Sequence, residues 1–262
     1  MALLQTQALS VHFGGVKAVD QVDLRVEPGQ LVALIGPNGA GKTTFIDALT
    51  GLVRKRGRIV FDGTDISGLP AHRRPQQGLS RTWQSVGLFE DLTVRENLRV
   101  AAESFGVRTV MRDLVGRRRP TEQLGVDEAL ETLNLHAVGD QYPGQLSQGN
   151  RKLVGIARGL VSRPKLLCMD EPAAGLDSRE SRSLGAVIRG IVGSGLSGLI
   201  VEHDMGLVMT ICDYIYVLEF GRIIAHGTPD VIRTNERVLL AYLGTRKGRG
   251  LELARESGGA NA

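Results

Sequence analysis

The chain has 262 residues with a formal net charge of +4, and 42% of its residues are hydrophobic, enough to bury the core of one large domain or of a domain with a subdomain. No apolar run approaches the roughly 20 residues of a membrane-spanning helix, and the start "MALLQTQALS" lacks the features of a secretory signal peptide. Cys168 and Cys212 lie far apart in apolar contexts, so we expect buried thiols in a reducing compartment. These features predict a cytosolic protein whose contact with a membrane, if any, comes through partners.

Two basic clusters account for part of the positive charge, "RKRGR" at 54–58 and "GRRRP" at 116–120. We interpret them as solvated faces, with an anionic membrane surface or nucleic acid as the alternatives. Aromatic residues make up only 4% of the chain and do not alternate with these arginines, which argues against stacking on bases.

Apolar strand and helix patterns alternate along the chain, which predicts an α/β fold. Strands are expected at 3–12, 22–26, 31–35, 58–61, 165–169, 196–203, 214–219 and 222–226, with the turn "FGGVKAVD" joining the first two. Helices are expected at 42–51, at 127–135 and in two short segments after the last strand. Capping boxes mark two further helix starts, at Thr93 with Glu96 and at Asp177 with Glu180.

The middle of the chain is helical and interrupts the α/β pattern. We therefore predict a helical subdomain at about 87–162, inserted in a domain that spans 1–244 and including a polar, Arg-rich stretch at 106–124. The remaining residues, 245–262, have little to bury and are expected to be disordered.

A phosphate-binding pattern, GxxxxGK[ST], occurs in "GPNGAGKTT" between a buried strand and a helix. Its glycines let successive backbone N–H groups point at phosphates. Lys42 is expected to reach the β and γ phosphates, and the Thr43 hydroxyl to ligate Mg²⁺. The residues predicted to bind a nucleoside triphosphate are Gly36, Pro37, Asn38, Gly39, Ala40, Gly41, Lys42, Thr43 and Thr44.

Two adjacent acids, Asp170 and Glu171, end the buried strand at 165–169. Unpaired, they would cost several kcal/mol to bury. A bound Mg²⁺ and a positioned water remove that cost. We therefore expect Asp170 to hold Mg²⁺, through water, and Glu171 to act as general base on the attacking water.

A second helix start suited to an anion lies at "LSQGNRK", residues 146–152. Together with Gln84 in "RTWQ", "AGLD" at 174–177 and His203 in "VEHD", these motifs resemble those of ATP-binding-cassette (ABC) ATPases, in that family's order and over nearly the whole chain. The resemblance implies a P-loop NTPase core with an antiparallel β subdomain and an inserted helical subdomain.

The resemblance also explains why one chain carries two phosphate-facing helix starts. In this family two cassettes pack head to tail, so Ser147 and Gly149 would contact the γ-phosphate held by the partner's loop. The family's usual string is LSGGQ, and here Gln148 and Asn150 replace its first glycine and its glutamine.

Further roles follow from the resemblance, with ATP and Mg²⁺ as cofactors. Gln84 would touch Mg²⁺ or the attacking water. His203 would hydrogen-bond the γ-phosphate and orient Glu171, the alternative being an ordinary strand-end histidine. Asp177 would lie at the interface between cassettes, which is compatible with a helix N-cap. Phe13 would stack on adenine, with a core phenylalanine as the alternative.

Longer strings, among them "RTWQSVGLFEDLTVRENL" and "IAHGTPDVIRTNERVLLAYLG", resemble the ATPase subunits of branched-chain amino acid importers. That implies two permease subunits, a second cassette ATPase in a heterodimer or homodimer, an indirect link to a solute-binding protein, and a place on the inner face of the cell membrane; nucleic acid is not an expected partner. The alternatives are an ATPase for urea or amide uptake or for lipopolysaccharide export, a non-transport cassette, and another P-loop NTPase. The last leaves "LSQGN" and His203 unexplained.

Overall fold

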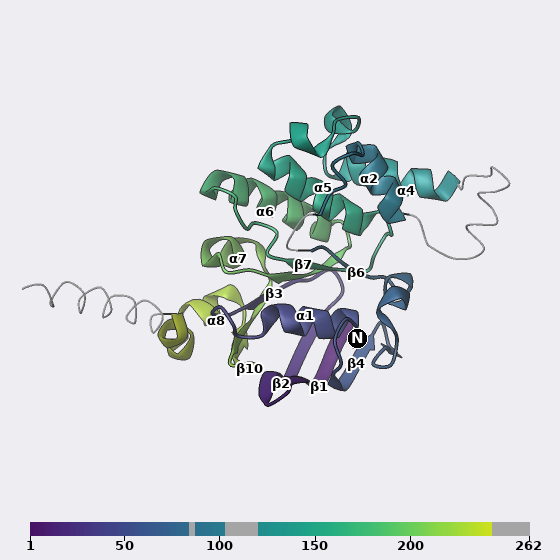
Figure 1. Ribbon diagram of the computed structural model, residues 1–262. Helices are drawn as coiled ribbons and strands as arrows, with labels where there is room; N and C mark the ends of the chain where they lie inside the picture. The colour runs from purple at the N-terminus through teal and green to yellow at the C-terminus, as the bar shows by residue number, and fades with distance from the viewer. Residues whose placement is uncertain (84–86, 103–119, 243–262) are drawn as a thin grey trace, which may run out of the picture.

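The computed structural model describes residues 1–83, 87–102 and 120–242, which form two sheets and the helices around them (Figure 1). The first sheet is antiparallel, in the order β2-β1-β4-β5. Its strands are β1 (Leu4–Phe13), β2 (Val16–Val26), β4 (Arg56–Phe61) and β5 (Thr64–Asp65).

The turn between β1 and β2 is shorter than the sequence pattern predicts. Phe13 pairs with Val16, so only Gly14 and Gly15 separate the strands, whereas the predicted turn covers 13–20. The difference lies in β2, which begins at Val16 and pairs with the end of β1 across register shifts, so its first residues show no regular apolar alternation. Gly14, with φ 57°, supplies the left-handed conformation that so tight a turn requires.

The second sheet has the order β10-β9-β3-β8-β7-β6, with all neighbours parallel except β10 and β9. Its strands are β3 (Leu31–Ile35), β6 (Leu79–Arg81), β7 (Leu166–Asp170), β8 (Ser197–Val201), β9 (Tyr214–Glu219) and β10 (Arg222–Gly227). Every residue of β3, β7 and β8 is buried, as is typical of parallel strands covered on both faces.

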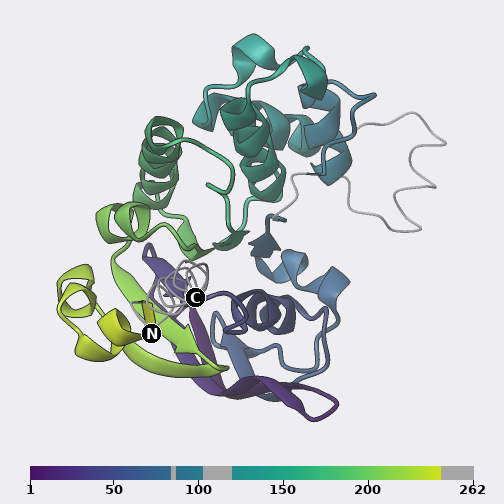
Figure 2. The same cartoon turned by 60° about the vertical axis from the view of Figure 1, so that its left-hand side comes forward.

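Helices cover both faces of this sheet (Figure 2). The α-helices are α1 (Lys42–Thr50), α2 (Val94–Ala102), α4 (Pro120–Thr132), α5 (Gln148–Leu160), α6 (Ser178–Gly193), α7 (Met205–Ile211) and α8 (Pro229–Arg233), followed by a helical segment at 236–242. Short 3₁₀ helices lie at Ala71–Arg73, Pro75–Gln77, His136–Val138 and Pro143–Gln145.

Two hydrophobic cores lie on opposite faces of the six-stranded sheet. Strand β3 contributes to both, because Ala33 and Ile35 face one core while Val32 and Leu34 face the other. Helix α1 lies in the second core, between the two sheets, and α5, α6 and α7 pack in the first. Helix α1 is therefore packed between the antiparallel sheet and the six-stranded sheet.

The described helices of the central block, α2, α4 and α5, pack against one another at the end of the molecule away from β1, β2 and β4 (Figures 1 and 2). Helix α4 begins at Pro120, earlier than the expected start at 127. The limits of a subdomain at 87–162 stay a prediction, and the cluster 116–119 and the tail 245–262 lie outside the described residues.

Both predicted capping boxes are present. The Thr93 N–H donates to Glu96 Oε2 at 2.8 Å, and the Glu96 N–H donates to Thr93 Oγ1 at 3.3 Å. Asp177 Oδ1 likewise accepts from the Glu180 N–H at 2.8 Å, and Glu180 Oε2 accepts from the Asp177 N–H at 3.3 Å. Each box satisfies two N–H groups that the first turn of a helix leaves unpaired.

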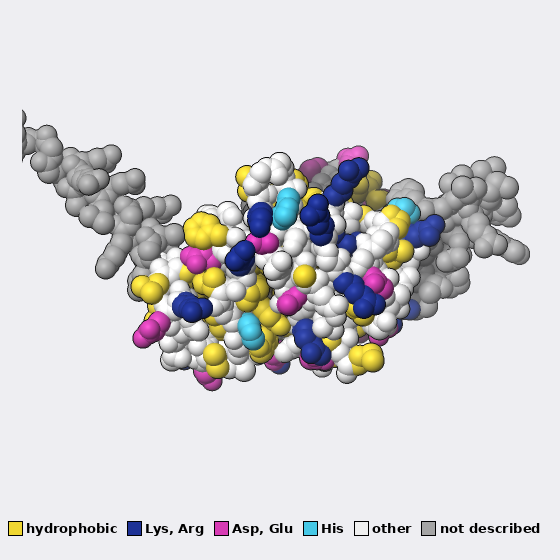
Figure 3. Space-filling model, turned by 90° about the horizontal axis from the view of Figure 1, so that it is seen from below, with side chains coloured by type: hydrophobic (Ala, Val, Ile, Leu, Met, Phe, Trp, Pro, Cys, Tyr) yellow, Lys and Arg dark blue, Asp and Glu magenta, His cyan; other side chains and the backbone are white. Residues whose placement is uncertain are grey.

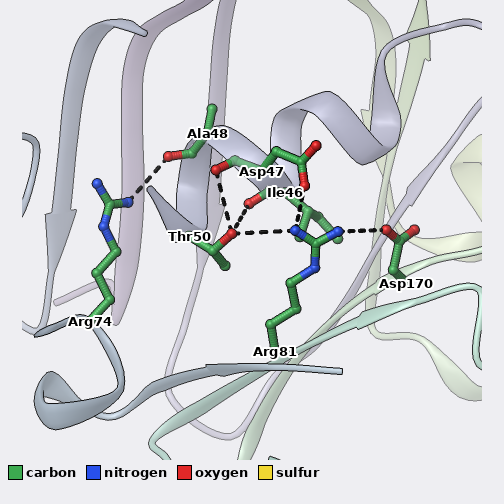
Figure 4. Close-up of polar contacts among 7 residues, drawn as sticks. All are labelled: Ile46, Asp47, Ala48, Thr50, Arg74, Arg81 and Asp170. Carbon is green, nitrogen blue, oxygen red and sulfur yellow. Dashed lines mark hydrogen bonds and ion pairs between the residues drawn. The ribbon is translucent and has the colours of Figure 1, made fainter. Parts of the chain in front are cut away.

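The far end of α1 is closed by a buried arginine, Arg74 (Figure 4). Its guanidinium donates to the carbonyl oxygens of Ala48 at 3.2 Å, of Leu49, and of Leu69 at 3.0 Å. The carbonyl end of a helix carries partial negative charge, which compensates the buried cation. Burial nevertheless lowers the pKa of Arg74.

Both cysteines are buried, as predicted, and burial raises the pKa of Cys168 and of Cys212 to about 12. Within the described ranges, no helix has the length and apolar character needed to cross a bilayer. Arg54, Arg56 and Arg58 of the first basic cluster are exposed. Lysine and arginine side chains on the face below β1, β2 and β4 are spread among acidic and uncharged groups (Figure 3).

Candidate nucleotide-binding site

The phosphate loop lies between the end of β3 and the first residue of α1, the strand–loop–helix context that the motif predicts. Lys42 is buried and folds back over the loop, where its Nζ donates to the carbonyl oxygens of Gly36 at 2.7 Å and Pro37 at 3.0 Å. Burial lowers the pKa of Lys42, and the charges of Glu171 and Asp170 oppose that shift. The loop thus holds a cation beside the N-terminus of α1, where negative charge is favoured.

Two glycines of the loop have no room for a side chain. A Cβ at Gly36 would overlap the carbonyl oxygen of Leu218 on β9, and a Cβ at Gly41 would overlap that of Ala18 on β2. The Gly221 N–H of the β9–β10 turn also donates to Ala40 O at 3.0 Å. Strands from both sheets therefore press against the loop and fix its path.

A cavity of about 440 Å³ opens over the loop. It is lined by residues 38–44 of the loop and α1, residues 16–18 of β2, Glu171, and the pair Phe220 and Gly221. Its size is in the range of small-molecule sites. Phe13 is the last residue of β1 and is 53% exposed. It does not line this cavity.

Asp170 and Glu171 occupy different environments at the end of β7. Asp170 is 1% exposed, whereas Glu171 lines the cavity together with the loop. Glu171 has φ 47°, a left-handed backbone conformation that an L-residue adopts at a cost. The Glu171 N–H donates to Val201 O at 2.9 Å, and Glu171 O accepts from the Ala174 N–H at 3.1 Å, so the chain turns immediately after the strand.

The buried carboxylate of Asp170 is paired with Arg81, the last residue of β6 (Figure 4). Arg81 Nη2 donates to Asp170 Oδ2 at 2.9 Å, and Arg81 Nη1 donates to Asp47 Oδ1 on α1. Burial raises the pKa of Asp170, and Arg81 opposes that shift. Asp170 Oδ1 is buried without a hydrogen-bond partner among the described residues.

This arrangement fits a magnesium ion held chiefly by a nucleotide. Mg²⁺ is commonly bound by one or two protein oxygens, phosphates and water. The unpartnered Asp170 Oδ1 and the exposed Thr43 offer such oxygens. Among the described residues no cluster of three or more His, Cys, Asp or Glu forms a cage for a metal ion.

His203 lies two residues beyond the end of β8, and its ring is 58% exposed. Its Nδ1 is 3.7 Å from Oε2 of Glu202, a fully buried carboxylate. Glu202 accepts from the N–H groups of Ala173 at 2.8 Å and His203 at 3.2 Å, and burial raises its pKa. Glu202 thereby ties the segment after Glu171 to the segment that carries His203.

The second predicted phosphate-facing helix start is not part of this cavity. Ser147 is the exposed N-cap of α5, and its Oγ accepts from the Asn150 N–H at 3.2 Å. Gly149 follows in the first turn, with a Cβ position no closer than 4.0 Å to Glu180 Oε1 and Ser147 Oγ. Neither Ser147 nor Gly149 lines the cavity over the loop. Gln84 lies outside the described residues.

The structure adds three residues that sequence reasoning did not single out: Arg81, Glu202 and Phe220. Glu202 precedes His203 in "VEHD", and a carboxylate directly after an apolar strand is a visible signal. Phe220 precedes a glycine at a strand-to-strand turn. Arg81 gives no local signal, because its acidic partners lie 34 and 89 residues away along the chain.

Comparison with protein families matches residues 19–174 to the family described as ABC transporter, and residues 222–247 to the branched-chain amino acid ATP-binding cassette transporter family. The chain is 40% identical to the high-affinity branched-chain amino acid transport ATP-binding protein BraF of Pseudomonas aeruginosa, over 92% of this chain and 98% of that protein. It is 37% identical to the lipopolysaccharide export system ATP-binding protein LptB of Haemophilus influenzae, over 93% and 98%.

Two solved structures share the fold closely. A nucleotide-free ATP-binding cassette from an ABC transporter has a TM-score of 0.82 at 30% identity, covering 92% of this chain and 99% of its own. The ADP conformation of MJ1267, an ATP-binding cassette of an ABC transporter, has a TM-score of 0.82 at 31% identity, covering 93% and 99%. The predicted P-loop fold with its antiparallel sheet is thereby confirmed, and the chain belongs to the ABC transporter family as an ATP-binding-cassette ATPase.

Proposed function

We propose that this ATPase powers the uptake of branched-chain amino acids through two permease subunits at the inner face of the cell membrane. The identity to relatives that carry this name and the family match at 222–247 support the solute class. Export of lipopolysaccharide is the second candidate, because the relative named for it is only slightly less similar. Nothing in an ATPase chain contacts the solute, so the assignment depends on its partners.

The placement of Glu171 in one cavity with the phosphate loop carries the catalytic part of the proposal. Residues 36–44 hold the triphosphate, Lys42 reaches its β and γ phosphates, and Thr43, Gln84 and Asp170 hold Mg²⁺, which neutralises charge on the phosphates. Glu171 accepts the proton of the water that attacks the γ-phosphate, as the bond to the leaving ADP breaks. His203 hydrogen-bonds the γ-phosphate and orients Glu171.

The exposed position of Ser147, outside the cavity of its own chain, supports a site shared between two cassettes. Ser147 and Gly149 would complete the partner's site with a hydroxyl, backbone N–H groups and the helix dipole. The partner is a second, different cassette ATPase or a second copy of this chain. Phe13, exposed at the end of β1, contacts the adenine once a nucleotide is bound.

The replacement Glu171→Gln tests the catalytic part. The amide keeps the shape but cannot take the proton, so hydrolysis should fall at least about 100-fold while ATP binding is kept. In gel filtration with ATP and Mg²⁺, this variant should accumulate as a closed pair of cassettes. Glu128→Gln, at an exposed ion pair with Arg163, is the matched control and should change neither. A Glu171→Gln protein that hydrolyses ATP normally would move the base elsewhere, with His203 the next candidate.

The replacement Ser147→Arg tests the shared site and the solute. It should impair hydrolysis at the partner's phosphate loop and leave ATP binding at Lys42 intact. Reconstitution with the permeases and the second cassette should raise turnover, most of all with a leucine-loaded binding protein. A fully active isolated homodimer that the permeases do not stimulate would refute the importer proposal. Stimulation by lipopolysaccharide in place of leucine would overturn only the solute.

A further inference from the structure

The side chain of Arg81 lies between the phosphate-loop helix and the strand that ends in the candidate magnesium ligand (Figure 4). Only 7% of it is exposed, although β6 is the edge strand of its sheet. One terminal nitrogen donates to Asp47 on α1 and the other to Asp170 at 2.9 Å at the end of β7. The guanidinium is thus a bridge between two elements that no backbone hydrogen bond joins.

The bridge reaches the face of α1 that begins at Thr43. Asp47 follows Thr43 by four residues, and side chains four apart in a helix lie one above the other on the same face. Through Nη1, Arg81 therefore contacts α1 one helical turn after the candidate magnesium-binding hydroxyl of Thr43. Through Nη2, it contacts the candidate magnesium-binding carboxylate of Asp170.

The same contact orients Asp170. A carboxylate rotates readily about its last torsion, but Arg81 Nη2 engages Oδ2 and leaves Oδ1 without a hydrogen-bond partner among the described residues. Only 1% of Asp170 is exposed, so bulk solvent has little access to the group. A planar, forked guanidinium suits this task better than an ammonium, because its donors have fixed relative directions.

Packing keeps the bridge in one geometry. The Trp83 ring lies 4.6 Å from Arg81 Cζ, close enough for a cation–π contact, and Thr50 Oγ1 lies 3.4 Å from Arg81 Nη1. The guanidinium is accordingly contacted from α1, from β7 and from the residues just beyond β6. Few alternative positions are open to it.

We propose that Arg81 is a positioning residue for the divalent cation: by joining Asp47 to Asp170 it fixes the separation between the Thr43 hydroxyl and the Asp170 carboxylate. The inference rests on the proposed function, in which this site binds Mg²⁺ with ATP. It assigns no contact between Arg81 and the nucleotide. Removing the bridge should therefore weaken the metal-dependent part of nucleotide binding and spare the part that the loop provides alone.

The test measures binding of a fluorescent ATP analogue to the full chain in EDTA and then during titration with Mg²⁺. Arg81→Gln should bind the analogue in EDTA within about twofold of the wild type, since loop contacts remain. The Mg²⁺ concentration for half-maximal enhancement should rise about tenfold or more, the usual effect of losing a group that orients a metal ligand. Arg81→Lys should give a smaller rise, because an ammonium meets the two carboxylates without the fixed fork.

Two further variants keep the result interpretable. Asp47→Asn leaves the contact between Arg81 and Asp170 in place but weakens the contact between Arg81 and α1. It should therefore raise the Mg²⁺ requirement, by less than Arg81→Gln does. Arg189→Gln removes an exposed ion pair with Asp213 and should change nothing. If Arg81→Gln is too unstable to purify, Asp47→Asn and Arg81→Lys carry the test.

Two outcomes overturn the inference. One is an unchanged Mg²⁺ requirement in folded Arg81→Gln and Asp47→Asn. Another is an equal loss of binding with and without Mg²⁺, which would indicate a structural role alone. A wild-type chain that shows no Mg²⁺-dependent binding would instead refute the proposed function itself, so the two failures are distinguishable.

Discussion

Replacing Gly41 by alanine should destabilise the chain and disrupt the phosphate loop, whereas the same change at Gly39 should have only a mild effect. Both residues have positive φ, 103° and 80° respectively. They differ in their surroundings. A Cβ at Gly41 would overlap the carbonyl oxygen of Ala18 on β2, while a Cβ at Gly39 would meet nothing within 4 Å. The pair separates backbone strain from steric overlap within one loop.

The magnitudes follow from these two terms. An L-residue in the left-handed region costs about 1–2 kcal/mol, and this term applies to both variants. At Gly41 the backbone of β2 must also move, because real Cβ atoms essentially never come within 3.0 Å of such an atom. Overpacking of this kind adds about 1–3 kcal/mol. We therefore expect losses of about 2–5 kcal/mol for Gly41→Ala and about 1–2 kcal/mol for Gly39→Ala.

Urea denaturation followed by far-UV circular dichroism measures both losses, and binding of a fluorescent ATP analogue measures the effect on the loop. Because Gly41 is the N-cap of α1, a shift there also moves the first N–H groups of the helix. Affinity should accordingly fall far more in Gly41→Ala than in Gly39→Ala. Equal stabilities and affinities in the two variants would refute the argument that contact between β2 and the loop fixes the site.

Three further predictions concern groups away from the reacting atoms. Arg74→Met should lower the free energy of unfolding by about 3 kcal/mol, since it removes charge-assisted hydrogen bonds to buried carbonyls. The control Arg25→Met, at an exposed ion pair, should lower it by under about 1 kcal/mol. Similar urea midpoints for the two variants would contradict this prediction. Phe220→Asn should stabilise the chain by about 1 kcal/mol, because Phe220 is 85% exposed with φ 46° and asparagine tolerates that conformation; a lower urea midpoint would count against it. In the folded chain the pKa of Cys168 and of Cys212 is about 12, above the ordinary value of 9.0. As the pH rises, the thiols of the unfolded chain therefore ionise before those of the folded chain, so the free energy of unfolding should fall between pH 9 and 12 by about 1.4 kcal/mol per pH unit for each thiol. A variant with alanine at both positions should show a shallower decline.

Local patterns in the sequence predicted the parts of the fold that local physics determines. The buried strand before the loop, the helix that starts at Lys42 and both capping boxes depend on neighbouring residues, and the structure contains them. Strand β6 was missed because three residues are too few for a periodic signal and the strand exists through pairing with β7. Helix α7 was also missed, because its seven residues make only about two turns and give a weak periodic signal.

In the candidate site, too, local motifs were predictable from the sequence and long-range contacts were not. Motifs identified Lys42, Asp170 and Glu171 because each lies in a short recognisable string, and the structure brings the three close enough for their charges to interact. The contacts that hold them in place are long-range. Arg81 pairs with an aspartate 89 residues away, and the sequence contains many arginines at comparable distances. Only the packing of β6 against β7 selects this one.

The strained backbone of Glu171 has a physical explanation in the different environments of Asp170 and Glu171. Successive side chains of a regular strand point to opposite faces of a sheet, so Asp170 and Glu171 could not both serve one site if β7 continued as an extended strand. Instead the chain adopts φ 47° at Glu171 and turns at once, held by bonds to Val201 and Ala174. Asp170 stays buried against Arg81 while Glu171 lines the cavity, and Lys42 feels both charges. A cost of about 1–2 kcal/mol in backbone strain is thus the local consequence of placing two adjacent carboxylates in different environments, the buried one being the proposed ligand of the metal ion and the other the proposed acceptor of the proton.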